Sequence, residues 1–299
     1  MTTMKISIRL VGGLGNQMFQ YAAGVGLAQQ RDGRVVLDLS AFSNYAPWPY
    51  QLDKLRVPQD IGEKAPPAWP PGRALAARLG RRLSVGVPRR MNGVYVEPHF
   101  HFDQSFFELG GDHIRLEGYF QSPLYFAGCE QLLRERFQPV AGFGATAQAW
   151  ADRIDATRGS VSLHVRRGDY VNNPNVAAVH ASVDQGYYSR AIATLRRMCG
   201  EELEFFLFSD DAAFVAQAFA ALPRAHVVRS DPARSWEDMF LMARCDHHII
   251  ANSSYSWWGA WLNASPEKVV LAPGQWFTRQ RLATTNIMDL FPAGWIILK

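Results

Sequence analysis

The stretch VSLHVRRGDY, residues 161–170, decides the expected fold class and chemistry of this chain. Its apolar part, 161–165, has valine at each end and predicts a buried strand. Arg166 and Arg167 follow at the carboxyl end of that strand, where open α/β sheets bind ligands. Buried guanidiniums need an anion there, because an unpaired buried charge is costly. We expect a diphosphate, and the alternative is a surface arginine pair held by Asp169.

The sequence around this stretch alternates between strand and helix patterns, which predicts parallel sheets with helices on both faces. The first half opens with a βαβ unit, and Gly142 and Gly144 loosen the chain before a possible linking helix, so we predict domains 1–150 and 151–299. The expected strands are 6–11, 35–39, 160–165, 203–208, 226–229, 248–251 and 268–271. The expected helices are 18–30, 130–137, 145–154, 185–198, 211–221, 236–244 and 255–262.

Composition indicates a globular enzyme that handles a small anion. The 299 residues are 48% hydrophobic and 19% charged, which excludes a disordered chain. A net charge of +4 suits an anionic small molecule and is too weak to argue for nucleic acid. No run is long enough to span a bilayer and the three cysteines are scattered, so we expect a cytoplasmic protein with reduced thiols.

One basic segment adds a second possibility for location. Gly72 to Arg82 carries four arginines and no acid. It predicts a solvated surface helix, with peripheral contact at the inner membrane or a lid over the acceptor as the alternatives.

A glycine-rich loop, GGLGNQ at residues 12–17, lies between the first strand and the first helix. Its glycines allow a backbone to approach a ligand closely, and a helix start offers N–H groups to an anion. The loop is neither a dinucleotide fingerprint nor a P-loop. A tight structural turn explains it about as well.

Two more loops carry polar groups after buried strands. In FSDD, residues 208–211, we expect Asp210 to recognise a nucleoside and Asp211 to cap the next helix. A metal site is the alternative there, although no further carboxylates are evident. In NSSYSWWGAW, residues 252–261, Ser253 and Ser254 form a second candidate anion cradle, while the tryptophans are expected to pack against the sheet.

His164 shares a strand face with Arg166, since the two lie two residues apart. A satisfied core histidine and a donor to a bound nucleotide both fit this position.

Four blocks in order, GGLGNQMFQYA (12–22), HVRRGDY (164–170), FSDD (208–211) and NSSYSWWG (252–259), resemble the α-1,2-fucosyltransferases of glycosyltransferase family 11. The resemblance implies a GT-B-type fold, with two Rossmann-like domains facing a cleft and parallel sheets flanked by helices. It implies that residues 1–150 form the acceptor side and that 151–299 bind GDP-fucose. The implied reaction is inverting transfer of L-fucose from GDP-β-L-fucose to a galactose-terminated oligosaccharide, without a metal or other cofactor.

The resemblance also assigns residues. Arg166 would bind the β-phosphate, and Arg167 would be a second, partly structural cation. His164 and Asp210 would contact guanine, and Ser253 and Ser254 would hold the diphosphate. Asn16, with Gly13 and Gly15, would lie near donor and acceptor.

The catalytic base is the least determined role. Asp169 is expected to act as base or as a brace for the arginines, on proximity alone. A protein O-fucosyltransferase and a non-catalytic nucleotide-sugar-binding module are the alternative functions.

Overall fold

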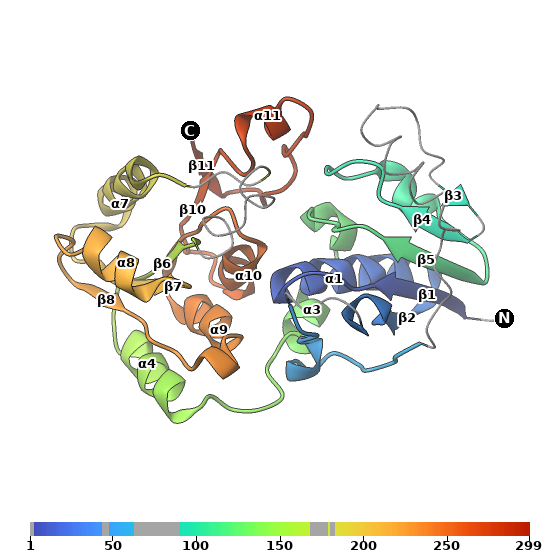
Figure 1. Ribbon diagram of the computed structural model, residues 1–299, viewed down its shortest axis with the longest axis horizontal. Coiled ribbons are helices and arrows are strands. Elements are labelled where there is room, and N and C mark those ends of the chain that lie inside the picture. Colours follow the sequence, from blue (N-terminus) through green and yellow to red (C-terminus); the bar gives the residue numbers. More distant parts are fainter. Residues whose placement is uncertain (1–2, 44–47, 63–89, 92, 168–178, 180–182) are drawn as a thin grey trace. The chain divides into compact units, whose positions relative to one another are not determined.

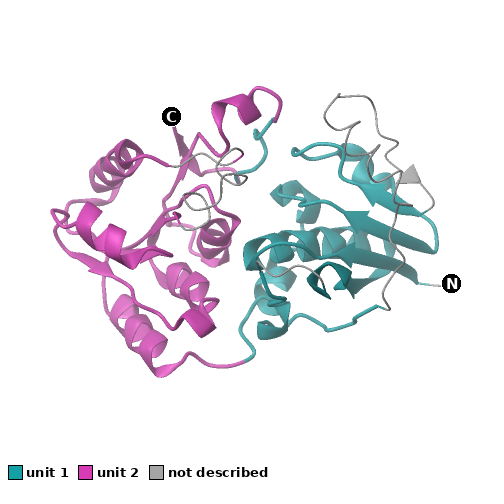
Figure 2. Ribbon diagram, viewed as in Figure 1, with its two compact units in different colours: residues 1–140, 286–291 teal, residues 141–285, 292–299 magenta. Residues whose placement is uncertain are grey.

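The computed structural model describes residues 3–43, 48–62, 90, 91, 93–167, 179 and 183–299. The chain forms two compact units, each built on one sheet with helices around it (Figures 1 and 2). The first unit is Met1–Val140 with Asn286–Phe291, and the second is Ala141–Thr285 with Pro292–Lys299. The expected α/β fold with parallel sheets flanked by helices is confirmed.

The first unit holds a five-stranded sheet in the order β2-β1-β5-β4-β3, parallel except for the β3–β4 pair. Its strands are β1 (Met4–Arg9), β2 (Gly33–Asp38), β3 (Arg90–Met91), β4 (Val94–Val96) and β5 (His113–Glu117). Its α-helices are α1 (Leu14–Arg31) and α3 (Glu130–Arg136). Short 3₁₀ turns are η1 (Ser40–Ser43), η2 (Leu52–Lys54), η3 (Gln104–Glu108) and η4 (Pro123–Phe126).

Helix α1 is the central helix of this unit, and its residues from Leu14 to Leu27 are buried almost without interruption. Apart from Gln17 and Gln20, these buried residues are apolar or small, as expected for a helix that is enclosed in a core. At Gly26 an added Cβ would lie 2.0 Å from the carbonyl oxygen of Tyr125 in η4. Glycine is therefore required there for the close approach of α1 and η4.

The second unit holds a six-stranded, wholly parallel sheet in the order β11-β10-β9-β6-β7-β8. Its strands are β6 (Ser160–Val165), β7 (Glu204–Ser209), β8 (Ala225–Val227), β9 (His247–Ile249), β10 (Val270–Pro273) and β11 (Ile296–Leu298). Its helices are α4 (Ala145–Asp155), α7 (Gln185–Cys199), α8 (Ala212–Ala218), α9 (Glu237–Arg244), α10 (Ser254–Leu262) and α11 (Arg279–Leu282), with the 3₁₀ turn η5 (Pro232–Arg234).

Alternating residues of β7 show how this sheet is covered on both faces. Phe205 and Leu207 join the core formed with α7 and α8. Phe206 and Phe208 point the other way and join the core formed with α4 and α9. Because successive strand residues face opposite sides, an all-apolar strand fits only a sheet that is buried twice.

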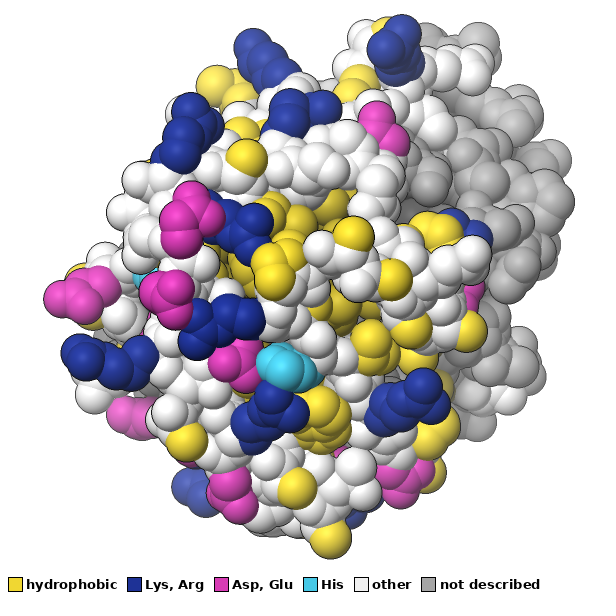
Figure 3. All heavy atoms as spheres, turned by 90° about the vertical axis from the view of Figure 1, so that its left-hand side faces the viewer, with side chains coloured by type: hydrophobic (Ala, Val, Ile, Leu, Met, Phe, Trp, Pro, Cys, Tyr) yellow, Lys and Arg dark blue, Asp and Glu magenta, His cyan; other side chains and the backbone are white. Residues whose placement is uncertain are grey.

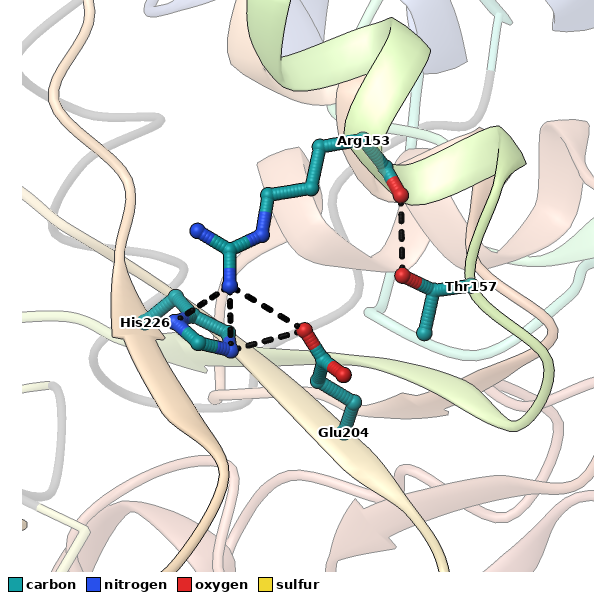
Figure 4. Close-up of polar contacts among 4 residues, drawn as sticks. All are labelled: Arg153, Thr157, Glu204 and His226. Atoms are coloured by element: carbon teal, nitrogen blue, oxygen red, sulfur yellow. Dashed lines mark hydrogen bonds and ion pairs between the residues drawn. The ribbon is translucent and has the colours of Figure 1, made fainter.

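The boundary between the units lies earlier than the predicted break at residue 150. Helix α4 belongs to the second unit, because Ala147, Ala151 and Ile154 are buried in its core with β7 and α9. A polar cluster attaches the same helix to the sheet (Figure 4): the Arg153 guanidinium lies 3.3 Å from Glu204 Oε1 and 2.9 Å from the His226 ring nitrogens. The segment Asn286–Phe291, expected in the second domain, returns to the first.

One face of the second unit is visible in Figure 3, where basic and acidic side chains are interspersed. This mixture agrees with the small net charge of the chain. Within the described ranges, no helix is both long enough and apolar enough to cross a membrane.

Candidate active site

The polar loops of the second unit lie at one edge of its sheet. Strands β9, β6, β7 and β8 are neighbours and parallel, so the residues that follow them emerge at the same edge. Ligands of open α/β sheets bind at this carboxyl edge. The topology therefore brings together Arg166, Arg167, Asp210, Ser253 and Ser254, as predicted from the sequence.

Arg166 and Asp210 form an ion pair at this edge. Arg166 Nη1 lies 2.9 Å from Asp210 Oδ2, and the two side chains are 18% and 25% exposed. Asp210 Oδ1 also accepts a hydrogen bond of 2.9 Å from the backbone N–H of Arg167. Asp210 thus orients the Arg166 guanidinium and fixes the Arg167 backbone, and the direct nucleoside contact expected from the sequence stays a prediction.

Arg167 is held against the start of α8. Its guanidinium carbon lies 3.6 Å from the centre of the Phe214 ring, and its Nε lies 3.4 Å from Asp211 Oδ2. Asp211 also caps α8, because its carboxylate accepts a hydrogen bond from Phe214 N at 3.0 Å. The predicted cap is confirmed, and these contacts support a structural role for Arg167.

His164 is buried on β6 beside the arginines. Burial, together with the charge of Arg166, lowers the pKa of His164 from 6.5 to about 4, so its ring is neutral at pH 7. Its Nδ1 atom is buried and has no hydrogen-bond partner among the described residues. A neutral imidazole with an unused nitrogen can donate to or accept from a ligand.

The third loop begins helix α10. Ser253 is the N-cap, and its hydroxyl accepts a hydrogen bond of 3.3 Å from Tyr255 N. Asn252 Nδ2 donates to the carbonyl of Trp276 at 3.0 Å, which ties the loop to the segment that follows β10. The tryptophans of α10 are buried and pack on one another, so the packing interpretation is confirmed for Trp257, Trp258 and Trp261.

The glycine-rich loop of the first unit is largely the first turn of a helix. Helix α1 begins at Leu14, four residues before the predicted start, so Gly15 and Asn16 are helical. Gly13 is its N-cap, and its carbonyl accepts hydrogen bonds from the N–H groups of Asn16 and Gln17 at 2.9 and 3.1 Å. Gly12 has φ of +81°, and a Cβ there would lie 2.7 Å from Asn16 Nδ2.

Gln17 and Asn16 have different roles in this turn. Gln17 is buried, donates to the carbonyls of Gly12 and Pro49 at 2.8 and 2.9 Å, and accepts from Gln51 N at 2.9 Å. It therefore stabilises the loop. The Asn16 side chain is only half-buried, and its Oδ1 accepts a hydrogen bond of 2.8 Å from Gln121 Nε2. Asn16 follows β1 and Gln121 follows β5, so both lie at the carboxyl edge of the first sheet.

Comparison with known proteins supplies the family. The family described as "Glycosyl transferase family 11" matches residues 102–299. The chain belongs to glycosyltransferase family 11. Among its relatives is the "Alpha-1,2-colitosyltransferase" of Escherichia coli, 34% identical over 96% of this chain and 97% of that protein. Another is the Escherichia coli "O-antigen biosynthesis glycosyltransferase WbnK", which is 31% identical over 97% of this chain and 99% of that protein.

An animal protein and a solved structure are also similar to this family 11 member. The "Galactoside 2-alpha-L-fucosyltransferase" of Caenorhabditis elegans is 25% identical over 88% of this chain and 70% of that protein. The fucosyltransferase NodZ from Bradyrhizobium superposes with a TM-score of 0.52 at 13% identity, covering 87% of this chain and 92% of that one. This structural likeness supports the expected GT-B-type fold.

Two predictions made from the sequence of this family 11 chain concern residues outside the described ranges. Asp169, the expected base or brace, is one of them. The basic segment from Gly72 to Arg82 is another, so its contact with the inner membrane stays a prediction, as does the cytoplasmic location. In the part of the chain that the structure describes, no three His, Cys, Asp or Glu side chains are grouped to hold a metal ion.

Asp238 is a further candidate site residue, which the sequence analysis did not single out. It lies in the first turn of α9, and its Oδ2 accepts from Ser230 Oγ at 2.9 Å. Its Oδ1 is buried without a hydrogen-bond partner in the described chain, and burial raises the pKa of Asp238 to about 6. Tyr255 links Asp238 to His164: its hydroxyl accepts a hydrogen bond of 2.8 Å from Met239 N, the residue after Asp238, and its ring centre lies 6.1 Å from that of His164. An acid in a first helical turn is common, so its position in the chain does not distinguish Asp238 from other such acids.

Proposed function

We propose that this protein transfers L-fucose from GDP-β-L-fucose to the 2-hydroxyl of a terminal galactose, with inversion at the anomeric carbon. The observation that carries the proposal is the Arg166–Asp210 pair at the carboxyl edge of the second sheet, beside the start of α10. Membership in family 11 and the names of its galactoside fucosyltransferase relatives support the choice of sugar and linkage.

The donor's leaving group explains why a cation is held at this edge. Breaking the bond between fucose and phosphate places negative charge on GDP and positive character on the sugar. A preorganised guanidinium stabilises that charge, and Asp210 fixes the guanidinium of Arg166 before the donor binds. The N–H groups at the start of α10, with Ser253 and Ser254, are suited to the same diphosphate. We propose that no metal or other cofactor takes part, and GDP-fucose is a co-substrate.

Guanine recognition is assigned to His164 and Asp238. The unused Oδ1 of Asp238 can accept a hydrogen bond from an N–H group of the base edge, and the unused Nδ1 of His164 can bind nearby. An unpaired buried polar atom is costly until a ligand pairs it, which favours the nucleotide with matching donors. Asp210 was also expected in this role. Its oxygens bind Arg166 and the Arg167 backbone, and the second lone pair of each leaves its contact with guanine part of the proposal.

Colitose is a second candidate for the transferred sugar. It is an analogue of fucose, and a relative named for colitosyl transfer is 34% identical over almost the whole chain. The two donors share the nucleoside diphosphate, so the second unit's anion site accommodates either. Measuring kcat/KM for GDP-fucose and GDP-colitose with one acceptor decides between them, and we expect the larger value for GDP-fucose.

The decisive test of the reaction is an acceptor screen with GDP-fucose in excess EDTA, followed by linkage analysis of the product. We expect an α-1,2 linkage to galactose on lactose or on a galactose-terminated O-antigen oligosaccharide, with full activity in EDTA. Transfer to a folded cysteine-rich protein domain instead would identify a protein O-fucosyltransferase. Tight GDP-fucose binding with neither transfer nor hydrolysis would identify a binding module.

A further inference from the structure

The carboxyl edge of the first sheet gathers polar groups that the donor site does not use. Strands β1, β5 and β4 are adjacent and parallel, so the residues after them lie at a common edge. The glycine turn 12–16 follows β1, the segment 118–121 follows β5, and Glu97 follows β4. Ligand sites of parallel sheets form at such an edge.

Hydrogen bonds tie the glycine turn to the segment after β5. Gln20 of α1 accepts from Val11 N at 2.9 Å and donates to the carbonyl of Gly118 at 3.0 Å. Gln121 Nε2 donates to Asn16 Oδ1 at 2.8 Å. Because Gln20 is buried, these bonds hold segment 118–121 in a fixed position beside Asn16.

Glu97 is fixed by that same segment. Its Oε2 accepts from Tyr119 N at 2.8 Å and its Oε1 from Phe120 N at 3.0 Å. A Cβ on Gly118 would lie 2.5 Å from Glu97 Cβ, so the glycine leaves room for this carboxylate. Each carboxylate oxygen still has a second lone pair after these bonds, and one of them can take a proton from a substrate.

Two other acids at this edge, Asp38 and Glu117, are paired with an arginine, and within the described ranges Glu97 is not. Arg115 lies 3.0 Å from Asp38 Oδ2 and 3.3 Å from Glu117 Oε1. Among the described residues, no cation forms an ion pair with Glu97. An acid that is paired with arginine is a poor base, so Glu97 is the better suited of the three.

The surroundings of Glu97 favour its protonated form. Burial is the main cause and raises its pKa to about 8, while the charge of Asp289 raises it further and the two backbone N–H bonds oppose the rise. Among the described residues, Tyr95 and Tyr125 also interact electrostatically with Glu97, and both stay neutral at this pH because burial raises their pKa values. A general base works best when its pKa is close to the operating pH.

An exposed aromatic ring lies next to this carboxylate in the chain. Tyr119 is 47% exposed although it is large and apolar, and its backbone N–H is bonded to Glu97. The flat face of an aromatic ring packs well against the apolar face of a sugar, while its hydroxyl stays in water. Glu97 and Tyr119 therefore form a pair suited to a neutral glycan.

We propose that Glu97 is the catalytic base of the transfer reaction and that Tyr119 lies beside the acceptor sugar. The proposal rests on the proposed function. The acceptor oxygen forms a bond to the anomeric carbon, the bond from that carbon to the phosphate oxygen breaks, and its electron pair leaves on GDP. The proton of the acceptor hydroxyl passes to the Glu97 carboxylate.

The test is the pH dependence of kcat/KM for the acceptor, measured between about pH 6 and 10 at saturating donor. The wild-type rate should rise with pH along a limb with an apparent pKa near 8, the value expected for Glu97. Glu97→Gln should lose this limb and about 10²–10⁴-fold of the rate, the usual contribution of a general base. Its GDP affinity and melting temperature should be close to wild type.

Two further variants separate catalysis from structure. Asp289→Asn removes the neighbouring charge that raises the pKa of Glu97, so it should shift the limb to lower pH and keep the plateau rate. Glu117→Gln is the matched control, because Glu117 lies at the same edge but is paired with Arg115, and it should leave the limb in place.

Three results would overturn the proposal. They are a wild-type profile without a limb between pH 7 and 9, a limb that persists in Glu97→Gln, and a limb that disappears in Asp169→Asn instead. The wild-type profile decides even if Glu97→Gln does not fold. The proposed function fails separately, when the wild type makes no fucosylated galactose product at any pH.

Discussion

Arg166 shows how a single side chain connects the sheet edge to the chemistry. Its ion pair with Asp210 leaves both side chains only partly exposed and fixes the guanidinium before a donor arrives. We predict that Arg166→Ala keeps its fold and loses about 10²–10³-fold in kcat, the typical cost of removing one such donor. The measurement is steady-state fucose transfer alongside a thermal melt.

The matched control for that variant is Arg244→Ala. Arg244 forms an ion pair with Asp155 on exposed side chains of α9 and α4, away from the polar loops. It should transfer fucose at the wild-type rate. Near wild-type kcat in a folded Arg166→Ala protein would refute the role given to Arg166.

Asp238 gives a second prediction at the residue scale. Asp238→Asn should weaken GDP binding by roughly tenfold to a hundredfold, because a hydrogen bond to a charged group contributes about 1.5–3 kcal/mol. It should leave pyrophosphate binding unchanged, since Asp238 is assigned to the base. Calorimetric titration with both ligands measures this, with Asp155→Asn as an exposed control. Equal loss for both ligands would argue against base recognition.

Among the elements, α4 illustrates which contacts stabilise the second unit. Arg153 is 46% exposed, so its bond to Glu204 should contribute under about 1 kcal/mol. Ile154 is buried in the core with β7 and α9, so Ile154→Ala should cost about 2–5 kcal/mol. Urea unfolding of Arg153→Ala and Ile154→Ala measures the difference. A larger loss for Arg153→Ala would show that the cluster in Figure 4, and not the core, holds the helix.

Buried histidines make the second sheet sensitive to acid. His164 and His248 both have pKa values below 6.5, because burial disfavours the cation. The unfolded chain then binds more protons than the folded one, so stability is fully present above pH 6.5 and falls as the pH drops from there toward about 4. Urea unfolding at several pH values checks this.

The variant for that experiment is His248→Asn. His248 is hydrogen-bonded to Ser162 at 2.8 Å and to Asn263 at 2.9 Å, which joins β6, β9 and the end of α10. The variant should be less stable at neutral pH, and its stability should decline less steeply in acid. An unchanged slope would show that other groups cause the acid sensitivity.

The buried strands of the second sheet and the helices that follow them were predictable from the sequence. Where the prediction and the structure differ, the cause lies in the local sequence. β6 and β7 are buried on both faces, so their residue pattern is unambiguous. The start of α1 was placed late because Gly15 and Asn16 are typical loop residues, yet the Gly13 carbonyl already starts the helix. Glu97 follows a strand of three residues, which is too short to show a period.

For the whole molecule, the position of the boundary has a measurable consequence. A fragment of residues 141–299 keeps α4, whereas a fragment of 151–299 loses Ala147 and exposes the apolar face of β7 and α9. We predict that the longer fragment folds and binds GDP and that the shorter one is unfolded. Circular dichroism and GDP titration of both fragments test this. Equal stability would favour the boundary at residue 150.

The six residues Asn286–Phe291 make the chain pass through the first unit on its way from β10 to β11. Asp289 accepts from Phe102 N at 2.6 Å and, through its carbonyl, from Ser122 Oγ at 3.1 Å, and Leu290 and Phe291 are buried. The chain therefore passes from one unit to the other at three places: between residues 140 and 141, between 285 and 286, and between 291 and 292. Cleavage by a protease near Gly142 would leave two polypeptides that still assemble, as in fragment complementation, and a nicked enzyme would keep its activity.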